Sequence, residues 1–537
     1  MHARHRRIGR FSLGTAVIAM SAVLVGCGTG TTGKQQPAAA ADRTFTYAVN
    51  AVPEHLDLTP WGGNGSKILY GVLDTSLVSY NNSCDKIGGA DNIRPNLAKS
   101  WEFSADGKSL TVHLGDAVSS WGNEITSADV EWSLRRELAN QGSLPSNWGK
   151  IGSYDMENLI EVIDEKTIKL SIKERKSFDA TQLASTLVAI HDSTEAKKHA
   201  TTDDPWALAW VKKNTADFGP WKLERFSPGS EIVLVPNPNY VGERGNFNKV
   251  VIRAVPESAV RLQLLQSGDV DWADALAYQE YAQLEKDDKI VVEECASGDR
   301  DELFLQQKFE PFSDVRVRQA MAAAIDRQRI VDEVYSGYGL PARDGLSQYF
   351  DFTPSKTAFE YDPERAKELL AEAGYPNGFS FTALFSEAKT GPYAERLMVQ
   401  MQADLKKVGI DMKLSRVPGG AEFFQLVHAQ SYEAVLYGDS TYVEDPSFAA
   451  GVFVMSTSSI NSFNYKSAKY DDTLRAAQKA EGDERNRLLA EVAAIGVTEM
   501  PVLYVADKAN VQAHRAGISG FENDPMLIHP AKLKTDK

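Results

Sequence analysis

The sequence predicts an α/β protein with more than one domain. Between residues 295 and 503, stretches with the two-residue alternation of strands are interleaved with stretches that have the spacing of amphipathic helices. Sheets covered by helices are one of the few stable layered arrangements, and such alternation favours them. The chain has 537 residues, 43% hydrophobic and 24% charged, which is typical of soluble globular proteins and long enough for two or three domains.

The N-terminal residues have the layout of an export signal. Four arginines precede an apolar stretch from Phe11 to Val25, and small residues follow. The stretch is too short to cross a membrane, because a spanning helix needs ~20 apolar residues. We therefore expect residues 1–26 to be a secretory signal peptide.

The residues at the expected cleavage point, Leu24-Val25-Gly26-Cys27, resemble the bacterial lipobox, in which the cysteine is acylated and becomes the mature N-terminus. The alternative is an ordinary signal peptide with an incidental cysteine. We favour lipidation of Cys27, with residues 27–41 as a flexible tether of small and polar residues. The protein is then exported and held by its acyl chains on the extracytoplasmic face of the cell membrane.

Charge argues against a nucleic-acid partner. The net charge is −15, and removal of the four arginines of the signal peptide makes it −19. So acidic a chain repels nucleic acid and anionic lipid headgroups.

The two cysteines beyond Cys27 are Cys84 and Cys295. In an oxidising compartment they could pair, but their spacing does not decide the matter. Of the two alternatives, we favour separate thiols.

No arrangement typical of an enzyme or a metal site is visible. HExxH, GxSxG and CxxC motifs are missing from the sequence. His191 and His199 lie eight residues apart with Lys197 and Lys198 between them, so we interpret both histidines as solvated surface residues. We expect a non-enzyme without cofactor or bound metal.

Local patterns place the first elements. Residues 44–49 alternate as a half-buried strand, a loop rich in glycine covers 60–65, and a helix-like run covers 68–77. A short helix is expected after Arg94, followed by a strand through Trp101.

A second strand carries Leu110, Val112 and Leu114 inward, and Thr126 with Asp129 forms a capping box for the next helix. That helix has an apolar stripe of Val130, Leu134 and Leu138. Further along, Ser313 is the expected N-cap of one helix. Asp362 is the N-cap of another, which Gly374 ends.

Several longer segments, in this order, resemble the family 5 extracellular solute-binding proteins, the oligopeptide-, dipeptide- and nickel-binding subunits of ABC importers. They are RPNLAKSWEFSADGKSLTVHL, FGPWKLERFSPGSEIVLVPNPNYVG, KVVIRAVPESAVRLQLLQSGDVDWA, PFSDVRVRQAMAAAIDRQRIVDEVYSGYGLPA, YDPERAKELLAEAGY, YEAVLYGDSTYVEDPSF and EMPVLYVAD.

The resemblance implies a two-lobed periplasmic-binding-protein fold of type II with an extra inserted domain and a ligand cleft between the lobes. Two lobes joined by crossing strands can close on a ligand by a hinge. The implied ranges are 42–72, 216–294 and 504–537 for the discontinuous domain I, 73–215 for the inserted domain II, and 295–503 for domain III.

In peptide-binding relatives, an aspartate three residues before the acidic residue that precedes proline pairs with the peptide ammonium. Here Asp445-Pro446 is retained, but the counted position is Tyr442. Asp439 stands where relatives usually have tryptophan, and Leu436 where some have arginine.

We therefore expect Asp439 to be the partner of a ligand cation, with Tyr437 and Tyr442 as aromatic walls. The alternative is that the alignment to the family is off by a few residues. Asp439 or Glu444 would then occupy the position of the aspartate that pairs with the peptide ammonium in the relatives. We discount Asp445 as part of a structural turn beside proline.

Two other regions supply candidate ligand contacts. The first ligand-facing loop of the family is matched loosely by Trp61, Gly62, Gly63 and Asn64. Trp148 is a candidate from its location in domain II.

Taken together, the sequence predicts a lipid-anchored receptor that captures a small solute, by default a peptide, and delivers it to ABC permease subunits with cytoplasmic ATPases. The alternatives are an opine, a sugar or a nickel chelate as the solute, or an orphan sensory or structural lipoprotein without a transporter.

Overall fold

The computed structural model describes residues 43–57, 64–73, 76–88, 92–140, 142, 144–184, 188–352, 354–439, 443–524 and 528–536, with residues 64–68, 421 and 439 by backbone alone. Cys27, with the expected signal peptide and tether, lies outside these ranges. Within the described ranges, every helix falls short of the length or apolarity that crossing a bilayer requires.

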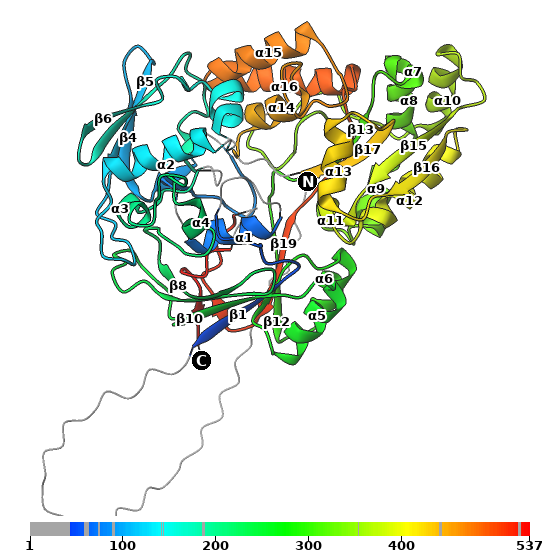
Figure 1. Cartoon of the computed structure of the whole chain (residues 1–537). Coiled ribbons are helices and arrows are strands. Elements are labelled where there is room, and N and C mark those ends of the chain that lie inside the picture. Colours follow the sequence, from blue (N-terminus) through cyan, green and yellow to red (C-terminus); the bar gives the residue numbers. More distant parts are fainter. Residues whose placement is uncertain are drawn as a thin grey trace, which may run out of the picture. The chain divides into compact units, whose positions relative to one another are not determined.

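One sheet of seven strands collects elements from both ends of the chain (Figure 1). Its first strand, β1, covers the residues expected from their alternation, and Phe45 and Val49 are fully buried in its core. β1 runs parallel to β10. In spatial order the strands are β12 (Ile290–Cys295), β19 (Asn510–Arg515), β11 (Trp272–Ala273), β1 (Thr44–Val49), β10 (Lys249–Ala254), β9 (Glu231–Pro236) and β8 (Trp221–Ser227).

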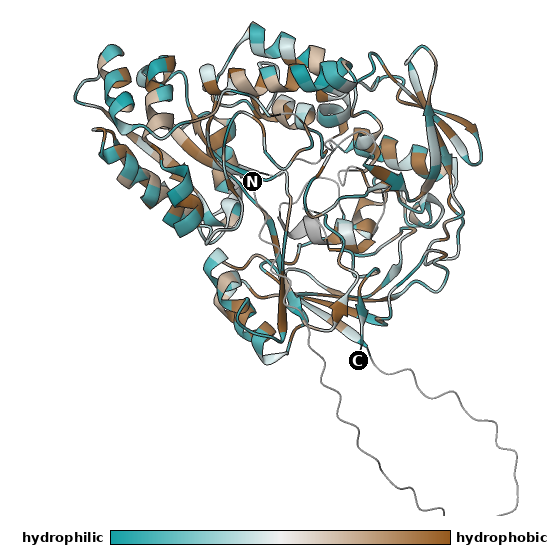
Figure 2. Ribbon diagram, turned by 180° about the vertical axis from the view of Figure 1, so that it is seen from behind, coloured by the Kyte–Doolittle hydropathy of each residue, from teal (hydrophilic) through white to brown (hydrophobic). Residues whose placement is uncertain are grey.

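A second sheet has six strands and is buried on both faces. Along β13, Leu303 and Leu305 enter one hydrophobic core, while Phe304 enters the other, as strand alternation requires. Figure 2 shows hydrophobic residues along the strands and hydrophilic residues on the outer sides of the helices. The spatial order is β14 (Leu340–Pro341), β18 (Leu503–Asp507), β13 (Arg300–Leu305), β17 (Ala434–Asp439), β15 (Ser380–Phe385) and β16 (Asp411–Arg416).

The helices that pack in these two cores come from different stretches of chain. One core takes α8 (Val315–Ala324), α9 (Arg327–Glu333), α10 (Pro363–Glu372) and α12 (Ala394–Lys406). The other takes α13 (Gly420–His428), α14 (Pro446–Val454), α15 (Ala468–Lys479) and α16 (Gly482–Thr498). The helix–sheet layering confirms the expected α/β class.

A third, antiparallel sheet of four strands packs with α2 (Ser127–Ala139). Its order is β4 (Ala98–Phe103), β5 (Ser109–Leu114), β7 (Thr167–Ser171) and β6 (Ile160–Asp164). The expected capping box is present, because the Thr126 N–H donates to Asp129 Oδ2 at 2.7 Å. Of the predicted stripe, Val130 and Leu134 are fully buried, and Leu138 is half-buried.

The remaining elements are short strands and helices between these layers. They are β2 (Val78–Tyr80), β3 (Ile93–Pro95), β20 (Ile518–Ser519), β21 (Lys534–Thr535), α1 (Asn64–Leu73), η1 (Pro145–Ile151), η2 (Thr181–Ala184), α3 (Ser193–Lys197), α4 (Leu208–Val211), α5 (Ser258–Ser267), α6 (Tyr278–Leu284), α7 (Glu310–Ser313) and α11 (Glu387–Thr390).

Three local predictions were wrong in detail. The helix expected at 68–77 is described as α1 over Asn64–Leu73; residues 74–75 lie outside the described ranges, and residues 76–77 are not helical. The short helix expected after Arg94 is strand β3, because its backbone pairs with β2. The cap expected at Ser313 is one residue later: Asp314 Oδ1 accepts from the Arg316 N–H at 2.8 Å, while the Ser313 hydroxyl donates to the Glu310 carbonyl.

The preference for separate thiols was also wrong. Cys84 and Cys295 form a disulfide across a sequence separation of 211 residues. A backbone hydrogen bond also joins the two segments, since the Ala296 N–H donates to the Cys84 carbonyl at 2.8 Å.

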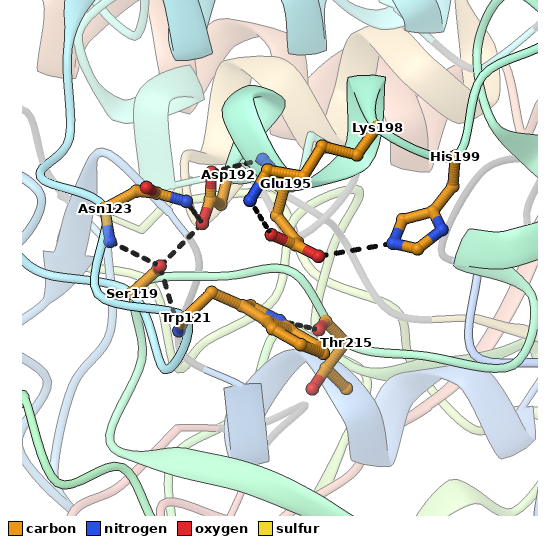
Figure 3. Close-up of polar contacts among 8 residues, drawn as sticks. All are labelled: Ser119, Trp121, Asn123, Asp192, Glu195, Lys198, His199 and Thr215. Atoms are coloured by element: carbon orange, nitrogen blue, oxygen red, sulfur yellow. Dashed lines mark hydrogen bonds and ion pairs between the residues drawn. The ribbon is translucent and has the colours of Figure 1, made fainter.

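The expectation for the histidines was half right. His199 is exposed, stacks on Trp210 at 4.3 Å and lies 3.2 Å from a Glu195 carboxylate oxygen (Figure 3). His191 is buried: its N–H donates to Ser133 Oγ of α2 at 2.9 Å, and its ring lies edge-on to that of Trp132 at 6.1 Å. Burial, followed by the charge of Arg136, lowers the pKa of His191 to about 4.

The division into domains I, II and III stays a prediction. Strands of the seven-stranded sheet come from the domain I ranges and those of the four-stranded sheet from the domain II range. β18 begins at Leu503, on the expected boundary, and lies in the six-stranded sheet with the strands of the domain III range.

Candidate functional site

Two chain segments connect the seven-stranded sheet with the six-stranded sheet. β12 continues through residues 296–299 into β13, and β18 continues through residues 508–509 into β19. The Lys508 N–H donates to the Asp299 carbonyl at 2.9 Å, which ties the two crossings together. β17 ends beside the start of β13, opposite Arg300. Three strand ends and both crossings therefore meet at one place, which we take as the candidate site.

One face of β13 carries a buried ion pair at this place. Asp301 is fully buried, and its carboxylate lies 3.2 Å from Lys508 Nζ. The Tyr335 hydroxyl donates to Asp301 at 2.6 Å, and Lys508 Nζ donates to the Tyr393 hydroxyl at 3.1 Å. Burial opposes the charge of Lys508, but the carboxylates of Asp301 and Asp299 raise its pKa overall. Lys508 is thus held as a cation between the two crossings.

The opposite face of β13 carries a second pair. Arg300 Nε lies 2.6 Å from an Asp507 carboxylate oxygen, and the guanidinium lies over the Tyr504 ring at 4.5 Å. Beside them is a cavity of about 20 Å³, which has room for about one water. Glu302 lines it with Tyr504, whose buried hydroxyl has no hydrogen-bond partner among the described residues. The cavity is too small for a transported solute.

Of the predicted aromatic walls, Tyr437 lies within the six-stranded sheet. Its ring stacks on Phe304 at 4.8 Å and is 6% exposed. Lys389 Nζ lies 4.9 Å from the centre of the Tyr437 ring and donates to the Gly438 carbonyl at 2.6 Å. A cation of the chain itself therefore lies over this ring, and ligand contact by Tyr437 stays a prediction.

Most of the other predicted contacts are outside the described residues. The backbone of Asp439 pairs with Arg300 at the end of β17, while its side chain is outside the description. Asn64 begins α1, again described by backbone alone. Four residues are outside altogether: Trp61, Gly62, Gly63 and Tyr442.

Trp148 is a core residue of the region around the four-stranded sheet. It is 2% exposed, and its ring centre lies 4.8 Å from that of Tyr154. Packing alone explains a tryptophan here, so its role as a ligand contact stays a prediction.

Asp445 has the structural role expected of it. It caps α14 by accepting from the Ser447 and Phe448 N–H groups at 2.8 and 3.1 Å, and Arg485 pairs with its other oxygen at 2.5 Å. Both carboxylate oxygens of Asp445 therefore have partners within the chain.

Glu444, the residue before this cap, is also buried, at 4% exposure. Its N–H donates to the Tyr80 hydroxyl at 3.2 Å. Burial, followed by the charges of Asp524 and Asp299, raises the pKa of Glu444 well above its ordinary value, while Asn82 acts in the opposite direction. Sequence reasoning weighed Glu444 but missed Asp299 and Asp524, because nothing local indicates that these three segments meet.

Comparison with known proteins gives the family and fold. The model for bacterial extracellular solute-binding proteins, family 5 (middle), matches residues 92–461. A probable D,D-dipeptide-binding periplasmic protein of Escherichia coli K12 is 28% identical over 86% of this chain and 87% of its own length. A dipeptide-binding protein of the same strain is 25% identical over 98% of both chains.

Solved structures of other binding proteins have a similar fold. The periplasmic binding protein DppA of Helicobacter pylori, in complex with the peptide STSA, has a TM-score of 0.79 at 24% identity and covers 92% of this chain and 99% of its own. AgaA of A. tumefaciens R10, in complex with agropinic acid, has a TM-score of 0.76 at 25% identity, with coverages of 92% and 99%. The predicted fold class and family are confirmed: the chain belongs to the bacterial extracellular solute-binding proteins of family 5.

Proposed function

We propose that this protein is the solute-binding component of an ABC importer and that its solute is a peptide. The observation that carries the proposal is the match to relatives named for dipeptide binding over 86% and 98% of the chain. The solute would be captured outside the cytoplasm and delivered to permease subunits driven by cytoplasmic ATPases. The protein acts by binding and release, as a family of binding proteins does.

Closure on the solute would use the two crossings at 296–299 and 508–509. They are the direct links between β12 and β13 and between β18 and β19, so rotation about them changes the relation of the two sheets. The three-domain division from the sequence fits this proposal, with domains I and III as the lobes.

The proposal includes a lipid anchor at Cys27. A lipobox-like cut followed by a polar tether supports it. Cys27→Ala should release the protein from the membrane fraction into the soluble fraction. Retention of the variant on membranes after a high-salt wash would contradict the anchor.

A second candidate solute is an opine. It is favoured by the likeness to AgaA, whose structure contains agropinic acid, and by Tyr442 at the place where peptide-binding relatives carry aspartate. A sugar, a nickel chelate or an orphan sensory or structural role has less support.

Mass spectrometry of solute retained after native purification tests the proposal. A peptide is the expected result, and an opine would favour the second candidate. The identified solute at a hundredfold excess over Kd should stabilise the fold by ~2.7 kcal/mol and lower the radius of gyration in X-ray scattering. If native preparations from the producing organism retain no solute and neither peptides nor opines raise the melting temperature, the proposal fails.

A further inference from the structure

One loop lies beside the first crossing and joins the two large sheets. It is segment 83–88, which follows β2, and we call it the strap. Its first end is fixed to the end of β12, because Cys84 forms the disulfide with Cys295 and the Ala296 N–H donates to the Cys84 carbonyl at 2.8 Å. Asn523 Nδ2 donates to the Ala296 carbonyl at 3.0 Å and to the strap carbonyl before Cys84 at 2.8 Å. This end therefore moves with the seven-stranded sheet.

The other end of the strap is held by a loop that follows β14. The Ile87 N–H donates to the Tyr349 carbonyl at 3.1 Å, and the Asp351 N–H donates to the Ile87 carbonyl at 3.3 Å. Lys86 Nζ donates to the Gln348 carbonyl at 2.8 Å. The Ile87 side chain is 1% exposed and belongs to the hydrophobic core that also takes α14 and α16. All these contacts are non-covalent, so this end can be released.

The loop at 348–351 is held to the six-stranded sheet, and the strap fits closely against its surroundings. The Gln348 N–H and side-chain amide both donate to Asp507 Oδ2, at the end of β18, at 3.0 Å. Gly88 has a φ of +80°, where other residues are strained, and a Cβ on it would lie 2.6 Å from the Glu444 carbonyl oxygen. A glycine is therefore needed where the strap passes the segment before α14.

The reach of the strap is short. Ile87 is three residues from Cys84, and an extended chain spans at most ~3.6 Å per residue, so the two can lie no more than about 11 Å apart. The strap is thus a third short link between the sheets, beside the crossings at 296–299 and 508–509. A hinge motion that takes the sheets farther apart than this reach has to break the contacts of Lys86 and Ile87, because the disulfide does not yield.

We propose that the strap controls the hinge: while the disulfide holds its first end, release of Lys86 and Ile87 from the loop at 348–351 is the step that lets the sheets move apart. The inference deepens the proposed function and rests on it. The contacts of the strap stabilise the arrangement in which the sheets are close. They therefore raise the affinity for a solute bound between the lobes.

The experiment removes each end of the strap separately and then both together. Lys86→Met removes the ammonium donor of the second end, and Gly88→Ala displaces the same end from the Glu444 carbonyl. Dithiothreitol removes the covalent end, as it is oxidised to its cyclic disulfide and the bridge becomes two thiols. Lys99→Met, at an exposed lysine of β4, is the matched control for the loss of one positive charge.

Two measurements need no solute. X-ray scattering of dialysed protein gives the radius of gyration, and hydrogen exchange follows the amides of Ile87 and Asp351. A third uses the dipeptide that wild type retains best from a synthetic mixture, with its affinity measured by calorimetry. Thermal melting checks that each variant is folded.

In the oxidised protein, Lys86→Met and Gly88→Ala should enlarge the radius of gyration and speed the exchange of both amides. Lys86→Met should weaken dipeptide binding roughly three- to tenfold, as the loss of one hydrogen bond does, while it melts like wild type. Reduction of wild type should also enlarge the protein and weaken binding, and Lys86→Met should add little to the reduced protein, because a strap acts only when both ends are held. Lys99→Met should behave as wild type does.

Two results would overturn the inference. One is an unchanged radius of gyration in both Lys86→Met and Gly88→Ala; the other is that the effects of Lys86→Met and of reduction simply add, as independent sites do. If reduction unfolds the protein, the comparison of Lys86→Met with Lys99→Met decides. Normal dipeptide binding with an unchanged radius in the variants would refute the strap and leave the proposed function standing. If wild type binds no dipeptide, the peptide fails as the proposed solute, and scattering and hydrogen exchange still decide the role of the strap.

Discussion

Two buried carboxylates in this protein have opposite surroundings. Asp192, in the region of the four-stranded sheet, is fully buried and accepts from Ser119 Oγ at 2.6 Å, Asn123 Nδ2 at 2.9 Å and the Glu195 N–H at 3.0 Å (Figure 3). Glu444, near the crossings, is almost as buried, yet its Oε2 has no donor among the described residues.

The difference separates a carboxylate that the chain itself satisfies from one with an oxygen that no described donor reaches. Donors around Asp192 satisfy its charge within the chain, and a satisfied polar network fixes one arrangement of the loop that carries Ser119 and Asn123. Among the described residues, Glu444 has a side-chain donor only from Asn82, and burial raises its pKa well above the ordinary value, which favours the neutral acid.

The largest expected effect on stability comes from removing the satisfied carboxylate. Asp192→Ala leaves three donors without an acceptor and should lower the free energy of unfolding by roughly 3–5 kcal/mol. Glu444→Gln should leave it unchanged or raise it slightly. Urea unfolding of both variants measures this, and equal destabilisation by the two would remove the distinction drawn between them.

The disulfide should contribute somewhat less. Replacing Cys84 and Cys295 together by serine should cost roughly 2–5 kcal/mol, because the bridge closes a loop of 211 residues in the unfolded chain. Reduced wild-type protein is the matched comparison. If the double variant and the reduced wild-type protein unfold at the same urea concentration as the oxidised protein, the disulfide adds nothing to stability.

A smaller effect is expected from His191, a neighbour of Asp192. Its folded-state pKa of about 4 is below the unfolded value of ~6.5, so the folded state binds fewer protons between these values. The free energy of unfolding should therefore fall as the pH drops through this window, by up to about 3 kcal/mol. His191→Gln should remove this part of the pH dependence, as followed by thermal melting. The exposed His199 provides the control: if His199→Gln has the same effect, the assignment to His191 is wrong.

Local sequence signals predicted much of the fold. The alternation in 44–49, the capping box of Thr126 and the cap at Asp362 each depend on residues within one turn or one strand, and each is present. The cap at Ser313 failed by one residue because adjacent Ser313 and Asp314 are both good caps, and only the geometry of the amide chooses between them.

The site could be predicted only as far as its segment. The family pattern led to residues 437–446, but the surroundings of Glu444 depend on Asn82, Asp299 and Asp524, which are far apart in the chain. The disulfide and the burial of His191 were missed for the same reason, since each arises from contacts between distant segments.

Proton release on binding tests most directly whether Glu444 is the partner of the solute's ammonium, the alternative that the sequence offers. Burial and the charge of Asp524 raise the pKa of Glu444, whereas a bound ammonium would favour its ionised form. The other titratable groups that face it are Asp299 and Tyr80, and His529 pairs with Asp524.

Calorimetry of the retained solute between about pH 5 and 8, in buffers of different protonation enthalpy, measures the protons released. Wild type should release up to about one proton per solute at the acidic end, and Glu444→Gln should release none. Binding heats that do not depend on the buffer, or proton release that persists in Glu444→Gln, would contradict the assignment of Glu444 as the partner of the solute's amine.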